Sequence, residues 1–134
     1  MPANNPDTSI LIVDDDVLLR RAIQDMLEIS GYQVWVAANA QDGLRFLKTA
    51  DRLPDVIISD FRLPGIDGAQ FLERVSANVS WKHIPFIFIS GSQEELTRSW
   101  INWESNVIAC LPKPFAIQAL FDAVAQATSM ARTT

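Results

Sequence analysis

A short run of β-branched residues that ends in a carboxylate decides much of how this chain folds. Residues 56–59 read Val-Ile-Ile-Ser, Asp60 follows them, and Pro54 and Pro64 bound the segment. So short an apolar run between prolines predicts a strand that is buried on both faces. Because a charge is costly inside such a strand, Asp60 is expected at its carboxyl end, where the chain leaves the sheet. That edge is where open α/β sheets bind their ligands.

The same pattern recurs along the chain and alternates with segments of helical periodicity. Strands are predicted at 9–13, 33–37, 55–59, 84–89 and 107–111, and helices at 17–29, 39–49, 69–75 and 115–127. Asp16 and Gly31 are the expected N-cap and C-terminal stop of the first helix. Such an alternation implies a parallel sheet with right-handed crossovers. The predicted fold class is α/β, a flavodoxin-like doubly wound (βα)5 three-layer sandwich with sheet order 2-1-3-4-5.

The composition indicates one ordinary globular domain. The chain has 134 residues, of which 49% are apolar, so a buried core is expected. The domain is predicted over 8–128, with 1–7 as a loose N-terminal lead and 129–134 as a C-terminal tail or the start of a linker. A net charge of −5 gives no reason to expect direct contact with nucleic acid or an anionic membrane.

Redox and targeting signals favour the cytoplasm. The single cysteine, Cys110, excludes an internal disulfide and fits a reducing compartment. No apolar run approaches the length of a membrane span, and residues 1–6 lack the basic and apolar regions of a signal peptide. A cytoplasmic location is therefore the default expectation.

The predicted strand order gathers acids at one edge of the sheet. The carboxyl ends of strands 1 and 3, which are neighbours in that order, carry Asp14, Asp15, Asp16 and Asp60. Close carboxylates repel one another unless a cation or proton intervenes. An all-oxygen acidic set suits Mg²⁺, which binds one or two carboxylates together with water and phosphate. Asp16 is interpreted as a helix cap, and the other acids as a candidate magnesium site.

The ends of strands 4 and 5 add a hydroxyl and an amine to this edge. Ser90, which Gly91 follows, offers a short hydroxyl that can donate to a phosphoryl oxygen. Lys113 lies between two prolines, and its ammonium can neutralise phosphate oxygens or pair with a carboxylate. The Lys113–Pro114 bond is a candidate for the cis form.

Four motifs together resemble one family, the receiver domain of two-component response regulators. They are the segments 10–16, 57–68, 84–90 and 111–115, in the order and spacing of that family. The likeness covers residues 8 to about 128. It implies a phosphoacceptor signalling switch, a phosphoprotein of a two-component system or phosphorelay, which catalyses only its own phosphorylation and dephosphorylation and is not otherwise an enzyme.

The resemblance also implies roles for individual residues. Asp60 would take the phosphoryl group from the phosphohistidine of a histidine kinase or phosphotransfer protein. Asp15 and Asp60 would bind Mg²⁺ directly, Asp14 largely through water, and Arg62 through its backbone carbonyl. Lys113 would contact the phosphoryl group.

The same resemblance gives Ser90 the role of switch hydroxyl, with an output face that runs from strand 4 to helix 5. The family usually pairs this hydroxyl with an aromatic residue on strand 5, three residues before the lysine, and here that position is Cys110. Our hypothesis is that the signal runs instead through residues 93–104, with Trp100 and Trp103. The alternative is that these tryptophans fill the core space that Cys110 leaves.

In this family, two further positions influence the lifetime of the phosphoryl group by controlling the access of water. Here they hold Arg62 and Ser92, with Gly91 between the two serines. A bulky, charged Arg62 is expected to shield the acyl phosphate and to lengthen its lifetime relative to Arg62→Ala.

Two other readings compete with the switch. A small Mg²⁺-dependent phosphohydrolase of the haloacid-dehalogenase type would take its nucleophile from an Asp-x-Asp motif on the first strand, which Asp14 and Asp16 mimic. Leu18 and the lack of room for a cap domain argue against it. A degenerate receiver acting as a scaffold is the other. The sequence leaves open the kinase, the downstream protein or output domain, homodimerisation, and whether the receiver stands alone.

Overall fold

The computed structural model describes residues 8–91 and 106–133, in which strands and helices alternate. In chain order they are β1 (Ser9–Val13), α1 (Val17–Ile29), β2 (Gln33–Ala37), α2 (Ala40–Thr49), β3 (Val56–Asp60), α3 (Gly68–Ser76), β4 (Phe86–Ser90), β5 (Val107–Pro112) and α5 (Ile117–Thr133). The hypotheses on Ser92, Trp100 and Trp103 lie outside the described residues. No helix among the described residues is long and apolar enough to cross a membrane.

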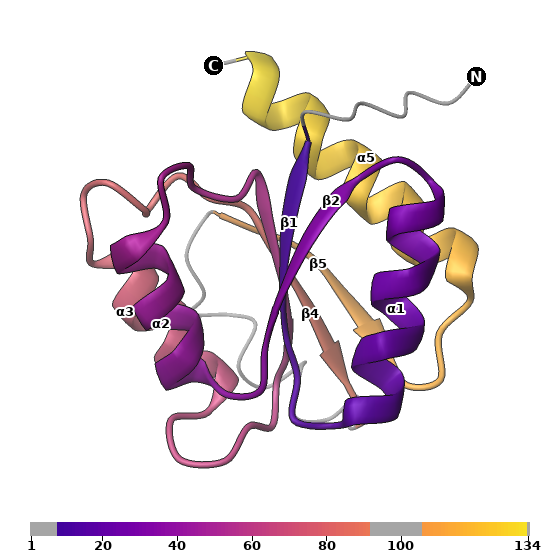
Figure 1. The fold of residues 1–134 in the computed structure, drawn as a ribbon, viewed down its shortest axis with the longest axis horizontal. Coiled ribbons are helices and arrows are strands. Elements are labelled where there is room, and N and C mark those ends of the chain that lie inside the picture. The colour runs from indigo at the N-terminus through magenta and orange to yellow at the C-terminus, as the bar shows by residue number, and fades with distance from the viewer. Residues whose placement is uncertain (1–7, 92–105, 134) are drawn as a thin grey trace.

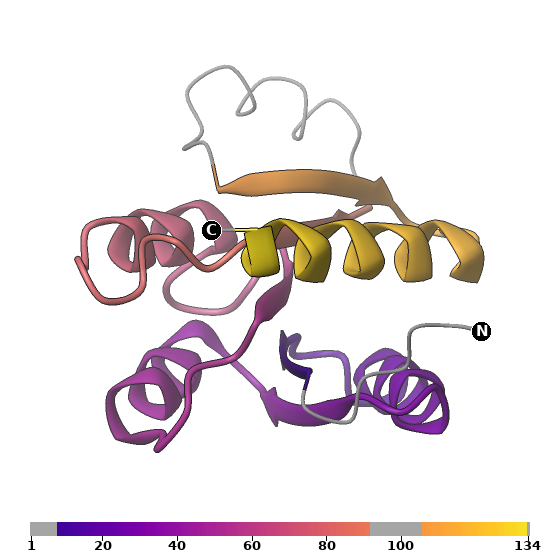
Figure 2. The same cartoon turned by 90° about the horizontal axis from the view of Figure 1, so that it is seen from above.

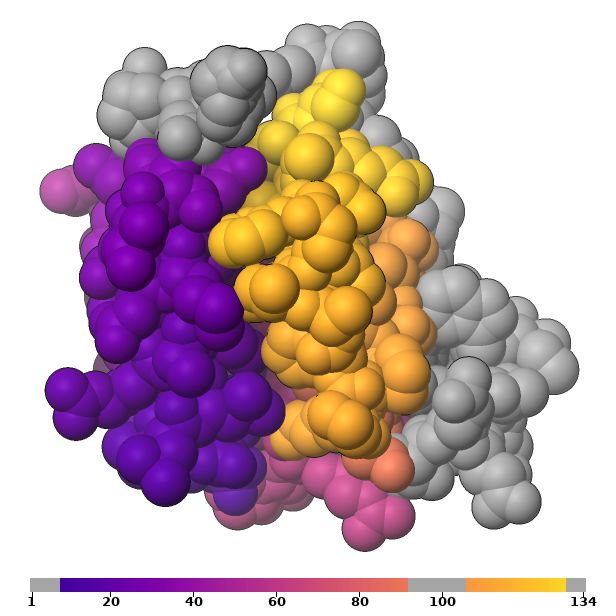
Figure 3. All heavy atoms as spheres, turned by 90° about the vertical axis from the view of Figure 1, so that its right-hand side faces the viewer, coloured from indigo at the N-terminus to yellow at the C-terminus, as the bar shows by residue number. Residues whose placement is uncertain are grey.

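The strands form one parallel sheet in the order β2-β1-β3-β4-β5, which confirms the predicted fold class. Helices α2 and α3 lie on one side of the sheet and α1 and α5 on the other (Figure 1). The view from above shows the same layers, with helices on both sides of the sheet (Figure 2). Helices α1 and α5 lie side by side and cover their face (Figure 3).

The sheet separates two hydrophobic cores, because successive side chains of a strand point to opposite faces. We call them the α2–α3 core and the α1–α5 core. The first contains Leu11, Val13, Ile57, Phe71, Phe86 and Phe88, and the second Ile10, Ile12, Ile23, Leu27, Ile58, Ile87, Leu120 and Val124, all fully or almost fully buried. Strands β1, β3 and β4 are buried at every position, as expected for strands covered on both faces.

β1 and β2 have the predicted bounds, those of β3 and β5 differ by at most one residue, and β4 shows the largest difference. This strand begins at Phe86, two positions after the predicted Ile84. The N–H of Ile84 donates to the carbonyl of Trp81 in the preceding turn, at 2.9 Å. Pro85, which follows, has no N–H to donate. Its carbonyl accepts from Ile57 of β3 at 2.9 Å, so regular pairing starts only beyond it.

The helix termini follow their capping residues except in α5. Asp16 caps α1 by accepting from the N–H of Leu19, and Gly31 beyond that helix has a φ of 100°, as the predicted cap and stop require. Helix α5 begins at Ile117 rather than Phe115 and runs to Thr133, well past the predicted end. The prediction ended this helix where its apolar stripe ends, but residues 128–133 contain no Pro or Gly to stop it.

Candidate functional site

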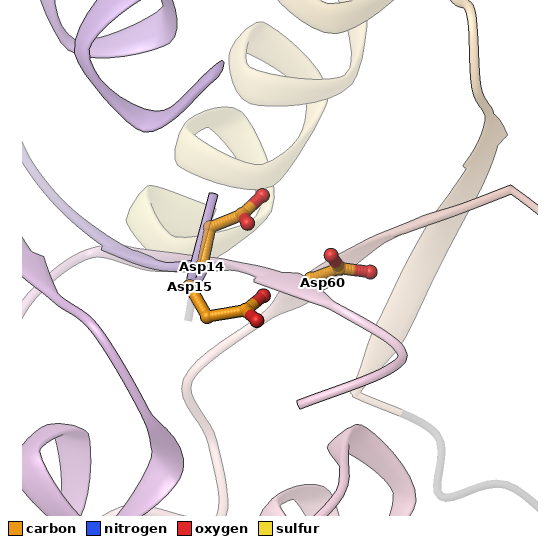
Figure 4. Close-up of side chains that lie close together, drawn as sticks. All are labelled: Asp14, Asp15 and Asp60. Atoms are coloured by element: carbon orange, nitrogen blue, oxygen red, sulfur yellow. The ribbon is translucent and has the colours of Figure 1, made fainter. Parts of the chain in front are cut away.

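Three carboxylates meet at the carboxyl edge of the sheet. Asp14 and Asp15 directly follow β1, Asp60 ends β3, and these two strands are hydrogen-bonded neighbours. One oxygen of each carboxylate lies within 4.8 Å of one from each of the others. Figure 4 shows the three side chains gathered at the ends of the two strands. Asp14 and Asp60 are buried, whereas Asp15 is exposed. The predicted acidic group therefore exists, and it opens to solvent through Asp15.

Asp14 is held at several atoms. Its N–H donates to the carbonyl of Ala37 at 3.1 Å, and its Oδ1 accepts from the N–H of Asp16 at 2.8 Å. Burial raises the pKa of Asp14 to about 6, and the negative charges of Asp60 and Asp15 add to this rise. The N–H of Asp16 and the ammonium of Lys113 act in the opposite direction without cancelling it. Negative charge at this edge is thus incompletely balanced by the protein.

Lys113 and Asp60 form an ion pair, with Nζ 2.8 Å from Oδ2. The other carboxylate oxygen of Asp60 accepts from the N–H of Arg62 at 3.2 Å. Burial lowers the pKa of Lys113, but the hydrogen bond to Asp60 and the charges of Asp60, Asp14 and Asp16 outweigh it, so the net shift is upward. Lys113 is therefore a positively charged ammonium at neutral pH, in contact with the acid of β3.

Ser90 ends β4 beside this pair. Asp60 pairs with Ile89 in the register of β3 and β4, which places Ser90 one position further toward the edge. Ser90 is buried, and its carbonyl accepts from the N–H of Lys113 at 2.7 Å. The Lys113–Pro114 bond is cis, the form for which the sequence made it a candidate. The hydroxyl-bearing residue and the ammonium-bearing residue are thus tied together through their main chains.

The start of α3 packs on the backbone of the central acid. A Cβ at Gly68 would lie 2.8 Å from the carbonyl oxygens of both Asp60 and Phe61, closer than real Cβ contacts. The N–H of Gly68 donates to the carbonyl of Phe61 at 2.8 Å. Asp67 caps α3 by accepting from the N–H of Gln70, whose side chain accepts from Asp67 in return. The loop that follows Asp60 is therefore fixed at both ends.

An open groove adjoins the acids on the side of this loop. It has a volume of about 470 Å³ and is lined by Asp15, Phe61, Arg62, Leu63, Pro64 and Asp67. Arg62 is exposed at the groove. Asp15 thus faces a space that is large enough for water and a small anionic group.

The structure places the remaining predicted residues as follows. Cys110 lies on β5, pairs with Phe88 in register and packs against the α2–α3 core. Burial raises the pKa of Cys110 to about 12, so its side chain is a protonated thiol at neutral pH. Gly91 is exposed, and a Cβ there would meet open space.

One residue beside the acids was not anticipated from the sequence. Arg20 of α1 donates from Nη1 to the backbone carbonyl of Asp14 at 2.8 Å. A signal for it exists in hindsight, because an arginine one helical turn after a capping aspartate can reach back to the preceding strand end.

Comparison with known proteins gives a consistent family. The family model described as "Response regulator receiver domain" matches residues 10–125. The chain is 34% identical to response regulator Rre1 of Synechocystis over 80% of its length, and 35% identical to the KDP operon transcriptional regulatory protein KdpE of Escherichia coli over 84%. It spans 46% and 48% of these two relatives, less than half of each.

A solved structure has the same architecture. The signal receiver domain of an HD domain-containing protein from Pseudomonas fluorescens superposes with a TM-score of 0.83 at 28% identity. The superposition covers 95% of this chain and 98% of that one. The likeness therefore extends over nearly the whole of both chains.

Proposed function

This chain belongs to the response regulator receiver domain family, and from that premise we propose that Asp60 is the phosphoacceptor of a two-component signalling switch. Receiver domains act as signalling switches. The observation that carries the proposal is the contact of Lys113 with Asp60 at 2.8 Å, beside the carboxylates of Asp14 and Asp15. A nucleophilic carboxylate, a fixed cation and further acids then share one sheet edge.

The proposed reaction transfers a phosphoryl group from a phosphohistidine to the carboxylate of Asp60. An oxygen of Asp60 attacks phosphorus, the new O–P bond forms as the N–P bond breaks, and the electron pair of the broken bond returns to the imidazole nitrogen. Such a transfer needs in-line positioning and neutralisation of charge more than it needs a general base. Lys113 supplies one positive charge at the acceptor, and the N–H of Arg62 holds the other oxygen of Asp60.

The acids fit a magnesium ion by their chemistry. They are hard oxygen donors, close together, and the raised pKa of Asp14 reports negative charge that burial leaves poorly compensated. We propose that Asp15 and Asp60 bind Mg²⁺ directly, Asp14 through water, and Arg62 through its carbonyl. When bound, the ion supplies Lewis-acid neutralisation of phosphoryl oxygens.

We further propose that Ser90 senses the phosphoryl group with its hydroxyl. Its position one residue beyond the partner of Asp60 supports this role. The output face would be that of β4, β5 and α5. Cys110 stands where the family usually has an aromatic partner, and a small thiol offers less change in buried area than a ring. We therefore propose that the signal runs through residues 93–104, with Trp100 and Trp103. The alternative is that these tryptophans fill the core space that Cys110 leaves.

The donor and the recipient of the signal are proposed from the family. We propose a histidine kinase or phosphotransfer protein as the donor, in the cytoplasm. The recipient is a downstream protein, or an output domain such as the longer relatives have room for. The haloacid-dehalogenase and scaffold alternatives gain no support from the comparisons.

Intact-mass measurement after incubation with acetyl phosphate and Mg²⁺ tests the proposal. The wild-type chain should gain the mass of one phosphoryl group, and Asp60→Asn should gain none. Equal phosphorylation of Asp60→Asn and the wild type would overturn the assignment of Asp60. Multiple turnover of a small phosphomonoester would favour a phosphohydrolase.

A further inference from the structure

We propose that Arg20 is a positioning residue that sets the direction in which Asp15 presents its carboxylate to a divalent cation. The inference rests on the proposed function, in which Asp14, Asp15 and Asp60 bind Mg²⁺. It adds a residue from the helix behind the acids, to which neither the sequence motifs nor the family match assigns a role.

Arg20 reaches the acids from one turn inside α1. Its own N–H donates to the carbonyl of Asp16 at 2.9 Å, in the first turn of the helix. Helical side chains lean toward the N-terminus of their helix, and the guanidinium of Arg20 follows this direction. Its Nη1 donates to the carbonyl oxygen of Asp14 at 2.8 Å, and the side chain is partly buried.

The carbonyl that Arg20 holds belongs to the peptide that links Asp14 to Asp15. Because a peptide unit is planar, fixing this carbonyl also fixes the N–H and the Cα of Asp15, the atom that carries its side chain. The other side of Asp14 is held by its N–H bond to Ala37 at 3.1 Å. Asp15 itself is exposed, so packing constrains its side chain little and the position of its backbone matters more.

The hydrogen bond of Arg20 and its charge predict opposite effects on Mg²⁺ binding when the residue is replaced. If its charge were what mattered, removing a cation beside an acidic site would strengthen the binding of Mg²⁺. If its hydrogen bond matters, removal frees the peptide and weakens binding, because groups that orient metal ligands typically contribute about 10- to 100-fold to affinity. The adjacent Arg21, which is exposed on the same helix, carries the same charge and serves as a matched control.

The test is a calorimetric titration of the unphosphorylated full chain with Mg²⁺, for the wild type, Arg20→Met and Arg21→Met. We expect Arg20→Met to bind Mg²⁺ about tenfold more weakly. Arg21→Met should stay within about twofold of the wild type, since an exposed charge is screened by salt. Circular dichroism confirms that each variant is folded. Arg20→Lys keeps the charge with a single, compact donor group, so its affinity for Mg²⁺ should fall between those of Arg20→Met and Arg21→Met. If Arg20→Met does not fold, Arg20→Lys takes its place.

Each outcome bears on the proposal. Binding of Mg²⁺ by Arg20→Met, or by Arg20→Lys in its place, as tightly as by Arg21→Met overturns it. At saturating Mg²⁺, phosphorylation of the Arg20 variant by acetyl phosphate should return to the wild-type level, and a persistent deficit there also overturns it. A wild-type chain that does not bind Mg²⁺ overturns the proposed metal site and this inference together. A wild type that binds, with an unaffected Arg20 variant, overturns this inference alone.

Discussion

The two edges of the sheet use aspartate in different ways. At the amino edge, Asp55 precedes β3 and accepts from the N–H of Ser9 at 2.8 Å and, more weakly, from its hydroxyl at 3.5 Å. Arg52 forms an ion pair with the same carboxylate oxygen at 3.5 Å. One carboxylate there has one guanidinium and one amide N–H as partners, so its charge is matched by the fold itself.

The carboxyl edge is not matched in this way. Three carboxylates lie within 4.8 Å of one another, and the ion pair described there joins only Asp60 to Lys113. Burial raises the pKa of Asp14 to about 6, and the charges of the neighbouring acids Asp60 and Asp15 add to this rise. Asp55 at the amino edge thus stabilises the fold, whereas folding disfavours the charged form of Asp14 at the carboxyl edge, where the three acids together suit a cationic ligand. Four experiments test this distinction.

Removing the cation at each edge should give the largest contrast. Lys113→Met should slow phosphorylation by acetyl phosphate by roughly 100- to 1000-fold, the usual cost of removing a group that stabilises transition-state charge. Arg52→Met should phosphorylate at the wild-type rate, because its ion pair lies at the other edge. Intact mass followed over time measures both rates. A wild-type rate for Lys113→Met would mean that the two edges do not differ in this respect.

Replacing the buried acid of the carboxyl edge should stabilise the metal-free chain. Between pH 3.8 and about 6 the folded chain keeps a proton on Asp14 that the unfolded chain releases. The wild type therefore loses stability as pH rises through this window. Asp14→Asn escapes that loss and should be more stable at pH 8 by at most about 3 kcal/mol, with the advantage fading toward pH 4.

Urea unfolding at pH 4, 6 and 8 in the presence of a chelator measures this difference. Equal stability of Asp14→Asn and the wild type at pH 8 would contradict the idea that folding disfavours the charged form of Asp14.

The acid of the amino edge should show the opposite sign. Asp55→Ala leaves the buried N–H of Ser9 without its acceptor and should lower the free energy of unfolding by about 2 kcal/mol at pH 7. Asp51→Ala, which removes a nearby exposed carboxylate, should change it by less than about 0.5 kcal/mol. Urea unfolding compares the two variants. A stabilised Asp55→Ala would remove the contrast between the edges.

Magnesium should act on one edge only, with the smallest of the four effects. At ten times its dissociation constant, an ion that binds only the folded chain raises the free energy of unfolding by about 1.4 kcal/mol. This gain should appear in the wild type and in Asp55→Ala, measured as a rise in Tm against a chelated sample. An Asp15→Asn/Asp60→Asn double variant should show none, and an undiminished gain in it would place the ion elsewhere.

The fold was predictable wherever local chemistry decided it. The bounds of β1 and β2 were predicted to the residue, because each is an apolar or β-branched run whose neighbours end it. The start of β4 was not, because it depends on how Pro85 meets Ile57 across the sheet. The extent of α5 was not either, since its last turns carry no apolar stripe to reveal them.

The site was predictable where strand ends alone place a residue. Asp14, Asp15, Asp60, Ser90 and Lys113 follow or end neighbouring strands, so the strand order was enough to bring them together. The contacts of Arg20 with Asp14 and of Asp55 with Ser9 were missed because each joins a side chain to a backbone group. Asp55 bonds to a residue 46 positions away, through the pairing of β1 with β3. A contact of this kind, between a side chain and distant main chain, leaves no pattern in spacing or polarity.

The close packing at Gly68 has a consequence for genetic variation in this chain. Every missense change of one base in a glycine codon introduces a residue that has a Cβ, and at this position the Cβ would lie 2.8 Å from the main-chain oxygens of Asp60 and Phe61. No single-base step therefore leads from Gly68 to a tolerated neighbour. A saturation library selected for a working chain should be depleted at position 68 as strongly as at the aspartate itself, although Gly68 contributes no functional group.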